Sequence, residues 1–305
     1  MRREDLPASL WRMENVGRRV LAVGRRVIQP PSGDDTRGGA APYRLYHRVG
    51  AGVNYALGLA EPLVHPRSRF ILVTNGRTGS ELLVTLLNSH PDIVCEGEIL
   101  ARRVDAPLRY IAGRAAQARL HGASAYGFKV IGPHVRYIQP LRRPDNFYAE
   151  MQAEGVHLIR LRRRDILAHA ISSTRAQSSG HWHHYTRADG TDFVAPTLDP
   201  VQVLAVMLVS EEAEHHLDGR LAGLDVHEFV YEDDLLGPLE QRRTVDAICA
   251  DLGLPSAPVA SDIIKVTPAH PSLGVANYDE ICQLLAATRF RDAIEAERET
   301  APADG

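Results

Sequence analysis

The feature that most constrains the fold is an alternation of short apolar runs with longer helical patterns. The strand-like runs are FILVT (70–74), YGFKVIG (126–132), VHLIRL (156–161) and VHEFV (226–230). Helical patterns include DILAHAISSTRAQ (165–177) and VQVLAVMLVSEEAEHHL (201–217). Alternating strands and helices are typical of a parallel sheet covered by helices on both faces. We therefore expect an α/β fold with a parallel sheet flanked by helices.

Composition excludes several classes of protein. The 305 residues, 44% hydrophobic and 24% charged, suffice to bury the core of one large domain. The sequence has no apolar run near the ~20 residues of a membrane span and no secretory leader, so we expect a cytoplasmic protein. A net charge of -3 argues against nucleic acid as a partner. Cys95, Cys249 and Cys282 form no CxxC pair, which favours three buried thiols.

The N-terminal section differs in character from the rest. Residues 1–66 are basic and include a polar, glycine-rich stretch at 29–42 that is typical of a linker. Before it, residues 10–28 place apolar side chains among arginines with helical spacing. This helix either touches an anionic membrane, covers the active site or packs on its own domain. We predict an extension over 1–66 and one domain over 67–305. The helix and residues 277–297 are also candidates for pairing in a homodimer.

A glycine-rich basic turn, NGRTGS at 75–80, joins the first strand to a Leu-rich helix. Such a turn exposes backbone N–H groups at a helix N-terminus, where an anion is stabilised. Gly76 and Gly79 allow close approach, Arg77 supplies charge, and Thr78 and Ser80 supply hydroxyl groups. The spacing is not that of a nucleotide-triphosphate P-loop, which needs G-x-x-x-x-G-K-[ST]. The alternative is a plain helix start, because Thr78 and Glu81 fit the capping-box pattern.

A second basic turn follows the strand at 156–161. Arg162, Arg163 and Arg164 end this strand, and Ser172 and Ser173 lie two turns into the next helix. Because parallel sheets bind ligands beyond the carboxyl ends of their strands, both basic turns lie where a ligand is expected. Two separate anion sites would suit a nucleotide with two phosphate groups. The alternative is a solvated arginine cluster.

With these segments in order, the sequence resembles the sulfotransferases that use 3′-phosphoadenosine 5′-phosphosulfate, in the bacterial branch of trehalose and nodulation-factor sulfotransferases. The matching segments are NGRTGSELLVTLLNSHPDIVCEGEIL (75–100), YGFKV (126–130), LRRRDILAHAISSTRAQSSGHWH (161–183) and FVYEDDL (229–235). They span most of the chain beyond the N-terminal section. The resemblance implies the P-loop-like sulfotransferase fold and sulfuryl transfer from this donor, without a metal.

The resemblance also implies roles for individual residues. Those implied to hold the 5′-phosphosulfate are Arg77, Thr78, Gly79 and Ser80. Arg164 and Ser172 would hold the 3′-phosphate, with Arg163 a close second to Arg164. Glu81 departs from the family pattern, which often has a threonine there, and its carboxylate would repel the phosphosulfate unless it is turned away.

The acceptor hydroxyl needs a base. In the resembling enzymes, a glutamate downstream of the first turn acts as this base. Glu98 is the first candidate for the base and Glu96 is the second. Whichever of the two is not the base is expected to bind the acceptor. Arg77 would stabilise the leaving phosphate, and Lys129 would neutralise charge near the transferred group or hold the acceptor. Asp165 is expected to cap its helix. The acidic turn at 231–233 is expected to support the site structurally.

The loop SSGHWHHYTR at 178–187 is the candidate wall of the acceptor pocket. Trp182, His181 and His183 would contact the acceptor, because an aromatic face stacks on the C–H surface of a sugar. Metal binding by the histidines is disfavoured, since no carboxylate or cysteine stands at a zinc-like spacing. The predicted acceptor is a hydroxyl of a carbohydrate, glycolipid or small metabolite.

Two other functions remain open. A nucleotide kinase is disfavoured by the missing P-loop lysine and by the lack of a magnesium-binding acid beside the turn. A catalytically silent module that binds anions or membranes is motivated by Glu81 and the basic N-terminus. This alternative predicts nucleotide-independent binding to liposomes and no sulfuryl transfer.

Overall fold

The computed structural model describes residues 54–59, 64–179, 194–263 and 271–294. The strands are β1 (Ser68–Thr74), β2 (Ile93–Glu96), β3 (Ala125–Ile131), β4 (Val156–Arg162) and β5 (Val226–Val230). The longer helices are α3 (Ser80–Asn88), α4 (Pro107–Leu120), α5 (Phe147–Ala153), α6 (Ile166–Ser179), α7 (Pro200–Leu221), α9 (Pro238–Asp251) and α10 (Tyr278–Leu285). Short helical turns are η3 (His134–Ile138), η4 (Pro144–Asn146), α8 (Tyr231–Asp234) and η5 (Pro271–Gly274).

The described residues form two compact units. The first, which we call the sheet unit, comprises the described residues up to 164 together with 213–263. The second, the helical unit, comprises the described residues of 165–212 and 271–294. Helix α7 runs from one unit into the other. The predicted boundary at residue 66 stays a prediction.

The sheet unit is built on five parallel strands in the order β2-β3-β1-β4-β5. Its central strand β1 is buried almost throughout, as expected for a strand covered on both faces. The register sets Thr74 at the end of β1 opposite Ile131 of β3 and Leu161 of β4. The turns that follow these three strands therefore meet at one edge of the sheet. The predicted α/β class with a helix-flanked parallel sheet is confirmed.

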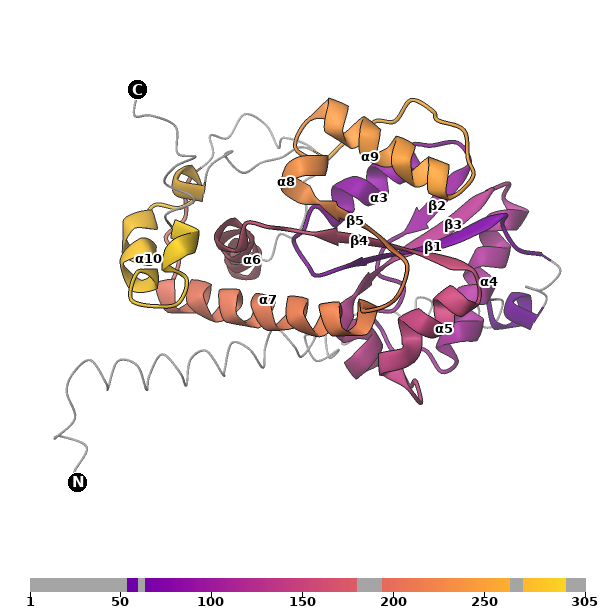
Figure 1. The fold of residues 1–305 in the computed structure, drawn as a ribbon, viewed down its shortest axis with the longest axis horizontal. Coiled ribbons are helices and arrows are strands. Elements are labelled where there is room, and N and C mark those ends of the chain that lie inside the picture. Colours follow the sequence, from indigo (N-terminus) through magenta and orange to yellow (C-terminus); the bar gives the residue numbers. More distant parts are fainter. Residues whose placement is uncertain (1–53, 60–63, 180–193, 264–270, 295–305) are drawn as a thin grey trace, which may run out of the picture. The chain divides into compact units, whose positions relative to one another are not determined.

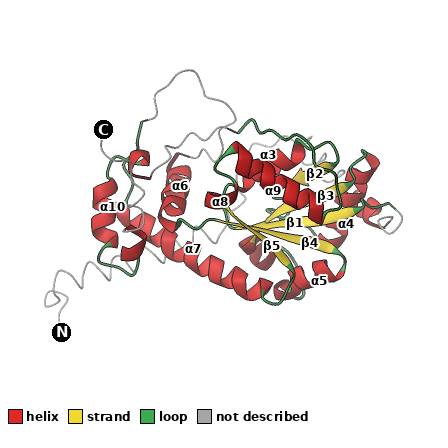
Figure 2. Ribbon diagram, turned by 45° about the horizontal axis from the view of Figure 1, so that its top comes forward, coloured by secondary structure: helices red, strands yellow, loops and turns green. Residues whose placement is uncertain are grey.

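Two apolar cores cover the two faces of this sheet. Phe70 and Leu72 of β1 pack with the leucines of α3 and with Ile248 of α9 on one face. Ile71 and Val73 pack on the other face, where α4, α5 and the C-terminal end of α7 contribute side chains. Figure 1 shows α3, α8 and α9 on one side of the strands and α4 and α5 on the other. The same layers can be followed in Figure 2, where the strands are yellow.

The helical unit has a separate core. Leu167, Ala170 and Ile171 of α6 are buried against residues of α7 and α10. Within the described residues, no helix has both the length and the apolar character needed to cross a membrane.

The three cysteines are buried and form no disulfide, as predicted. Cys95 and Cys249 belong to the core on the α3 and α9 face of the sheet unit, and Cys282 belongs to the core of the helical unit. Burial raises the pKa of Cys95 to about 12 and that of Cys249 to about 11. These two thiols are therefore protonated and unreactive at neutral pH.

Candidate active site

The basic turn between β1 and α3 has an unusual backbone. Arg77 has φ 66° and Gly79 has φ 83°, so two residues close together adopt the left-handed conformation. For an arginine this conformation is strained, and such strain collects at ligand-binding sites. Alternation of right- and left-handed residues turns successive N–H groups toward one side, which forms an anion-binding concavity. The two left-handed residues favour such a concavity, and anion binding by the turn stays a prediction.

The capping-box interpretation of this turn is wrong. Gly79 occupies the N-cap position of α3, and no side chain caps the helix. The Thr78 side chain is buried instead, with its hydroxyl 2.5 Å from that of Thr74 and donating to the Asn75 carbonyl at 3.2 Å. Ser80, the first residue of α3, is buried as well. Thr78 therefore fixes the inside of the turn.

Tyr231 of α8 packs against the turn at Gly79. A Cβ atom at Gly79 would lie 2.4 Å from Tyr231 Cδ2, so only glycine fits. The Arg163 guanidinium lies over the Tyr231 ring, 5.1 Å from its centroid, and its Nη1 donates to the Arg77 carbonyl at 3.4 Å. Arg163 Nε is buried without a hydrogen-bond partner. Of the two candidate phosphate-binding arginines, Arg163 is the one that contacts the first turn.

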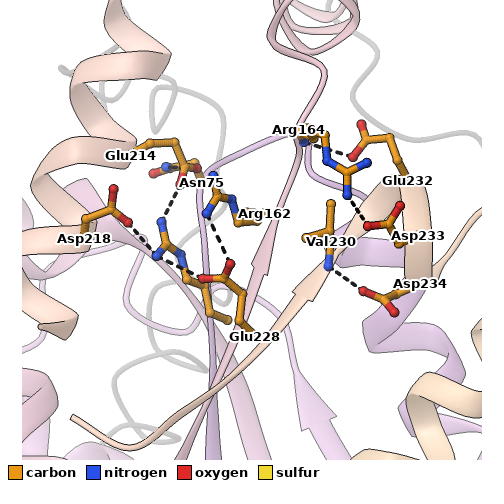
Figure 3. A network of polar contacts seen from close by, with 11 residues as sticks. Asn75, Arg162, Arg164, Glu214, Asp218, Glu228, Val230, Glu232, Asp233 and Asp234 are labelled. Carbon is orange, nitrogen blue, oxygen red and sulfur yellow. Dashed lines mark hydrogen bonds and ion pairs between the residues drawn. The ribbon is translucent and has the colours of Figure 1, made fainter. Parts of the chain in front are cut away.

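Arginines at the end of β4 are matched by carboxylates on neighbouring elements, and Figure 3 shows this network. Arg164 forms an ion pair with Asp233, and its backbone N–H donates to Glu232 Oε2 at 2.9 Å. The hydrogen bond and charge of Asp233 raise the pKa of Arg164 above its usual value. Arg162 Nη1 lies 3.2 Å from Glu228 Oε1. The acidic turn thus contacts the residues that follow β4, and its support of the site stays a prediction.

A second branch of the network reaches the first turn from α7. Glu214 Oε1 accepts a hydrogen bond from Asn75 Nδ2 at 2.6 Å, and its Oε2 accepts one from Arg160 Nη2 at 2.7 Å (Figure 3). Arg160 is 5% exposed and also pairs with Asp218 and Glu228. The first residue of the basic turn is therefore anchored to the sheet through α7. Sequence reasoning missed this anchor.

Lys129 lies at the centre of a charged cluster beside the turn. It is 4% exposed, and its Nζ lies 2.9 Å from Glu81 and 3.1 Å from Glu98. Burial lowers the pKa of Lys129, but Glu98 and Glu81 together outweigh burial and place it above the usual value. The cluster brings together the predicted base, the predicted lysine and the residue that departs from the family pattern.

His134, which sequence reasoning missed, completes this cluster. Its Nε2 lies 3.7 Å from Glu98 Oε2, and its Nδ1 is buried without a hydrogen-bond partner. Burial lowers the pKa of His134, Glu98 raises it and Lys129 lowers it, with a net decrease. The only sequence signal is its place shortly after β3, at the start of η3.

Glu96 has a different environment from Glu98. Arg114 of α4 binds its carboxylate through two nitrogens, one of them Nε at 2.9 Å, and Tyr126 donates to Glu96 Oε2 at 2.6 Å. These contacts tie β2 to α4 and β3. With its oxygens so engaged, Glu96 is the weaker candidate for a base, and Glu98 is favoured.

The other predicted residues lie elsewhere. Ser172 belongs to α6 in the helical unit, and its role stays a prediction. Asp165 Oδ1 accepts a hydrogen bond from the backbone N–H of Ala168 at 2.7 Å, which confirms it as a helix cap. Trp182, His181 and His183 lie outside the described residues. Among the residues that are described, no group of histidine, cysteine and acidic side chains is arranged to hold a metal ion.

Comparison with known proteins gives matches among solved structures. No protein-family model and no curated protein matches the chain. One similar structure is a sulfotransferase from Alicyclobacillus acidocaldarius, with 14% identity, TM-score 0.42, and coverage of 78% of this chain and 97% of that one. Another is the sulfotransferase domain of the Synechococcus PCC 7002 olefin synthase, with 15% identity, TM-score 0.36, and coverage of 79% and 97%.

Proposed function

We propose that the protein transfers a sulfuryl group from 3′-phosphoadenosine 5′-phosphosulfate to an acceptor hydroxyl. The observation that supports this proposal is the strained turn at 75–80, where Arg77 and Gly79 both have a left-handed backbone at the start of α3, a conformation that suits binding of an anion by backbone N–H groups. Arg163 contacts this turn, and the next residue, Arg164, lies just beyond the end of β4. One anion-binding turn and a neighbouring arginine pair suit a donor that carries phosphate groups at two positions.

The surrounding residues fit this donor in charge. The acidic side chain nearest to the turn in sequence is Glu81, and the buried Lys129 pairs with it at 2.9 Å. The ion pair offsets the repulsion that a lone carboxylate would exert on a phosphosulfate. Lys129 thus offsets part of the charge that Glu81 places beside the turn, while it also pairs with Glu98.

Each residue then has a role in the transfer. The acceptor O–H proton passes to Glu98 as the acceptor oxygen attacks sulfur, and the bond from sulfur to the 5′-phosphate oxygen breaks. Arg77 and the backbone N–H groups of the turn stabilise the charge left on the 5′-phosphate. Lys129, held between Glu81 and Glu98, fixes the position of the base. The proposed acceptor class is a carbohydrate, glycolipid or small metabolite, and the residues proposed to bind it are Trp182, His181 and His183.

Calorimetric titration with adenosine 3′,5′-bisphosphate tests donor binding. We expect binding that needs no magnesium, exceeds that of AMP and ATP, and is lost in Arg77→Ala and Arg164→Ala. Arg242→Ala, which removes an exposed arginine of α9 paired with Asp246, is the matched control and should bind as the parent does. A chain that does not distinguish the bisphosphate from AMP would reject the proposal, and magnesium-dependent ATP turnover would favour a kinase.

The rate of sulfuryl transfer tests the role of Glu98 as the base. With labelled donor and a panel of sugars, glycolipids and phenols, Glu98→Gln should bind the bisphosphate normally and transfer ~10²–10⁴-fold more slowly. Glu154→Gln, at an exposed position, controls for the loss of one carboxylate. Near-normal transfer by Glu98→Gln would move the base to Glu96 or a histidine. Absence of transfer to every acceptor, together with nucleotide-independent liposome binding, would favour the catalytically silent alternative.

A further inference from the structure

The four residues of α8 each make a separate contact within the sheet unit. Tyr231 packs against Gly79, and Asp234 accepts a hydrogen bond from the Val230 backbone N–H at 2.6 Å. Glu232 binds the backbone N–H of Arg164 and lies 3.5 Å from Arg163 Nε. Asp233 pairs with the Arg164 guanidinium (Figure 3). The first three contacts fix the backbone at the site, whereas Asp233 contacts only a side chain in these interactions.

Glu232 and Asp233, the two acidic residues that contact Arg163 and Arg164, differ in solvent exposure. Glu232 is 21% exposed, and its partner Arg163 is 17% exposed. Asp233 and Arg164 are 54% and 61% exposed, so their pair lies at the surface. Exposed ion pairs contribute little to stability because solvent screens them and ordering two side chains is unfavourable. The Asp233–Arg164 pair can therefore open at little cost, unlike the contacts of Glu232.

We propose that Asp233 competes with the nucleotide 3′-phosphate for Arg164 and so weakens nucleotide binding. The inference rests on the proposed function, in which Arg164 holds the 3′-phosphate. A phosphate group carries more negative charge than a carboxylate, so it displaces Asp233 from the guanidinium. The net affinity gained from Arg164 is therefore smaller, because the Arg164–Asp233 ion pair must break when the nucleotide binds.

This competition acts equally on donor and product. Sulfuryl transfer leaves the 3′-phosphate unchanged, so adenosine 3′,5′-bisphosphate meets the same competitor as the donor. Product release limits turnover in many enzymes, and a carboxylate that replaces the departing phosphate on Arg164 favours release. Asp233 thus favours product release by lowering the affinity for the 3′-phosphate alone.

The test is a titration of the full chain with adenosine 3′,5′-bisphosphate and with AMP at low ionic strength. Asp233→Asn should bind the bisphosphate about three- to fivefold more tightly and AMP as the parent does. In an Arg164→Ala background, Asp233→Asn should not restore the lost bisphosphate binding, because the competition acts through Arg164. Glu240→Gln is the matched control, since it removes a partly exposed carboxylate paired with Arg243 on α9.

Two outcomes overturn the inference while leaving the proposed function standing. Unchanged or weaker bisphosphate binding by Asp233→Asn would mean that Asp233 positions Arg164 rather than competing for it. Equal tightening of bisphosphate and AMP would mean a general charge effect. A parent chain that does not prefer the bisphosphate over AMP would instead reject the proposed function itself, and the inference with it.

Discussion

Arg77 and Gly79 hold conformations that the rest of the chain has to maintain. A left-handed arginine is unfavourable by itself, so its neighbours must hold it in place. Tyr231 fills the space beside Gly79, Arg163 binds the Arg77 carbonyl, and Thr78 binds the Asn75 carbonyl inside the turn. These contacts hold the turn in its left-handed form.

Gly79→Ala should therefore damage both stability and binding. The left-handed backbone costs about 1–2 kcal/mol for alanine, and the clash with Tyr231 adds about 1–3 kcal/mol. Gly253→Ala is a matched control, because Gly253 has φ 66° but no atom within 4 Å of an added Cβ. Urea unfolding should place Gly79→Ala below Gly253→Ala in stability. Equal losses would contradict the close packing of Tyr231.

His134 makes the stability of the protein depend on pH in the acid range. Its pKa in the folded chain is depressed, chiefly by burial, so folding favours the neutral ring. The unfolded chain, with an ordinary histidine pKa of about 6.5, binds the proton more readily. The contribution is therefore fully present above about pH 6.5 and is lost as the pH falls toward the folded pKa.

His134→Gln should make the free energy of unfolding less dependent on pH between about 7 and 5. Denaturant titrations at several pH values measure this slope. His157→Gln, at an exposed position of β4, controls for the removal of one histidine. An unchanged slope in His134→Gln would show that the depressed pKa of His134 does not contribute.

Elements far apart in sequence are joined at the site by α7. Glu214 on this helix binds Asn75, which precedes the turn, and Arg160, which lies inside β4. The turn, the strand and the helix are therefore held by one carboxylate. A change at Glu214 acts on the turn without touching any residue predicted to bind the nucleotide.

Glu214→Ala should lose about 1–3 kcal/mol of stability and weaken binding of adenosine 3′,5′-bisphosphate, because it leaves Asn75 and Arg160 short of a partner. Asp218→Ala removes another carboxylate from Arg160 and leaves the bond to Asn75 intact. It should lower stability with a smaller effect on binding. Equal effects on binding would mean that Asn75 does not transmit the change.

The strands with long apolar runs could be predicted from sequence, and short or small-residue elements could not. Strand β2 has four residues in an acidic segment, so periodicity does not reveal it. Helix α4 buries mainly alanine and glycine, which give a weak apolar pattern. The basic turns were predictable from local spacing. The bond from Asn75 to Glu214 was not, because 139 residues separate them and no local pattern indicates the pair.

At the scale of the whole molecule, the described chain has separate cores in its two units. The sheet unit is covered on both faces, whereas the helical unit packs α6, α7 and α10 without a strand among its described residues. Units with their own cores can open at different free energies. We expect the helical unit to open first, because its core contains fewer buried side chains.

The reactivity of the three buried thiols can test which unit opens first. Cys282 can be modified only when the helical unit opens, and Cys95 and Cys249 only when the sheet unit does. Labelling the unaltered chain with a thiol reagent in increasing urea, followed by mass spectrometry of the cysteine peptides, should modify Cys282 before the other two. Simultaneous modification of all three would mean cooperative unfolding. The chain thus records the order of its own unfolding without any introduced probe.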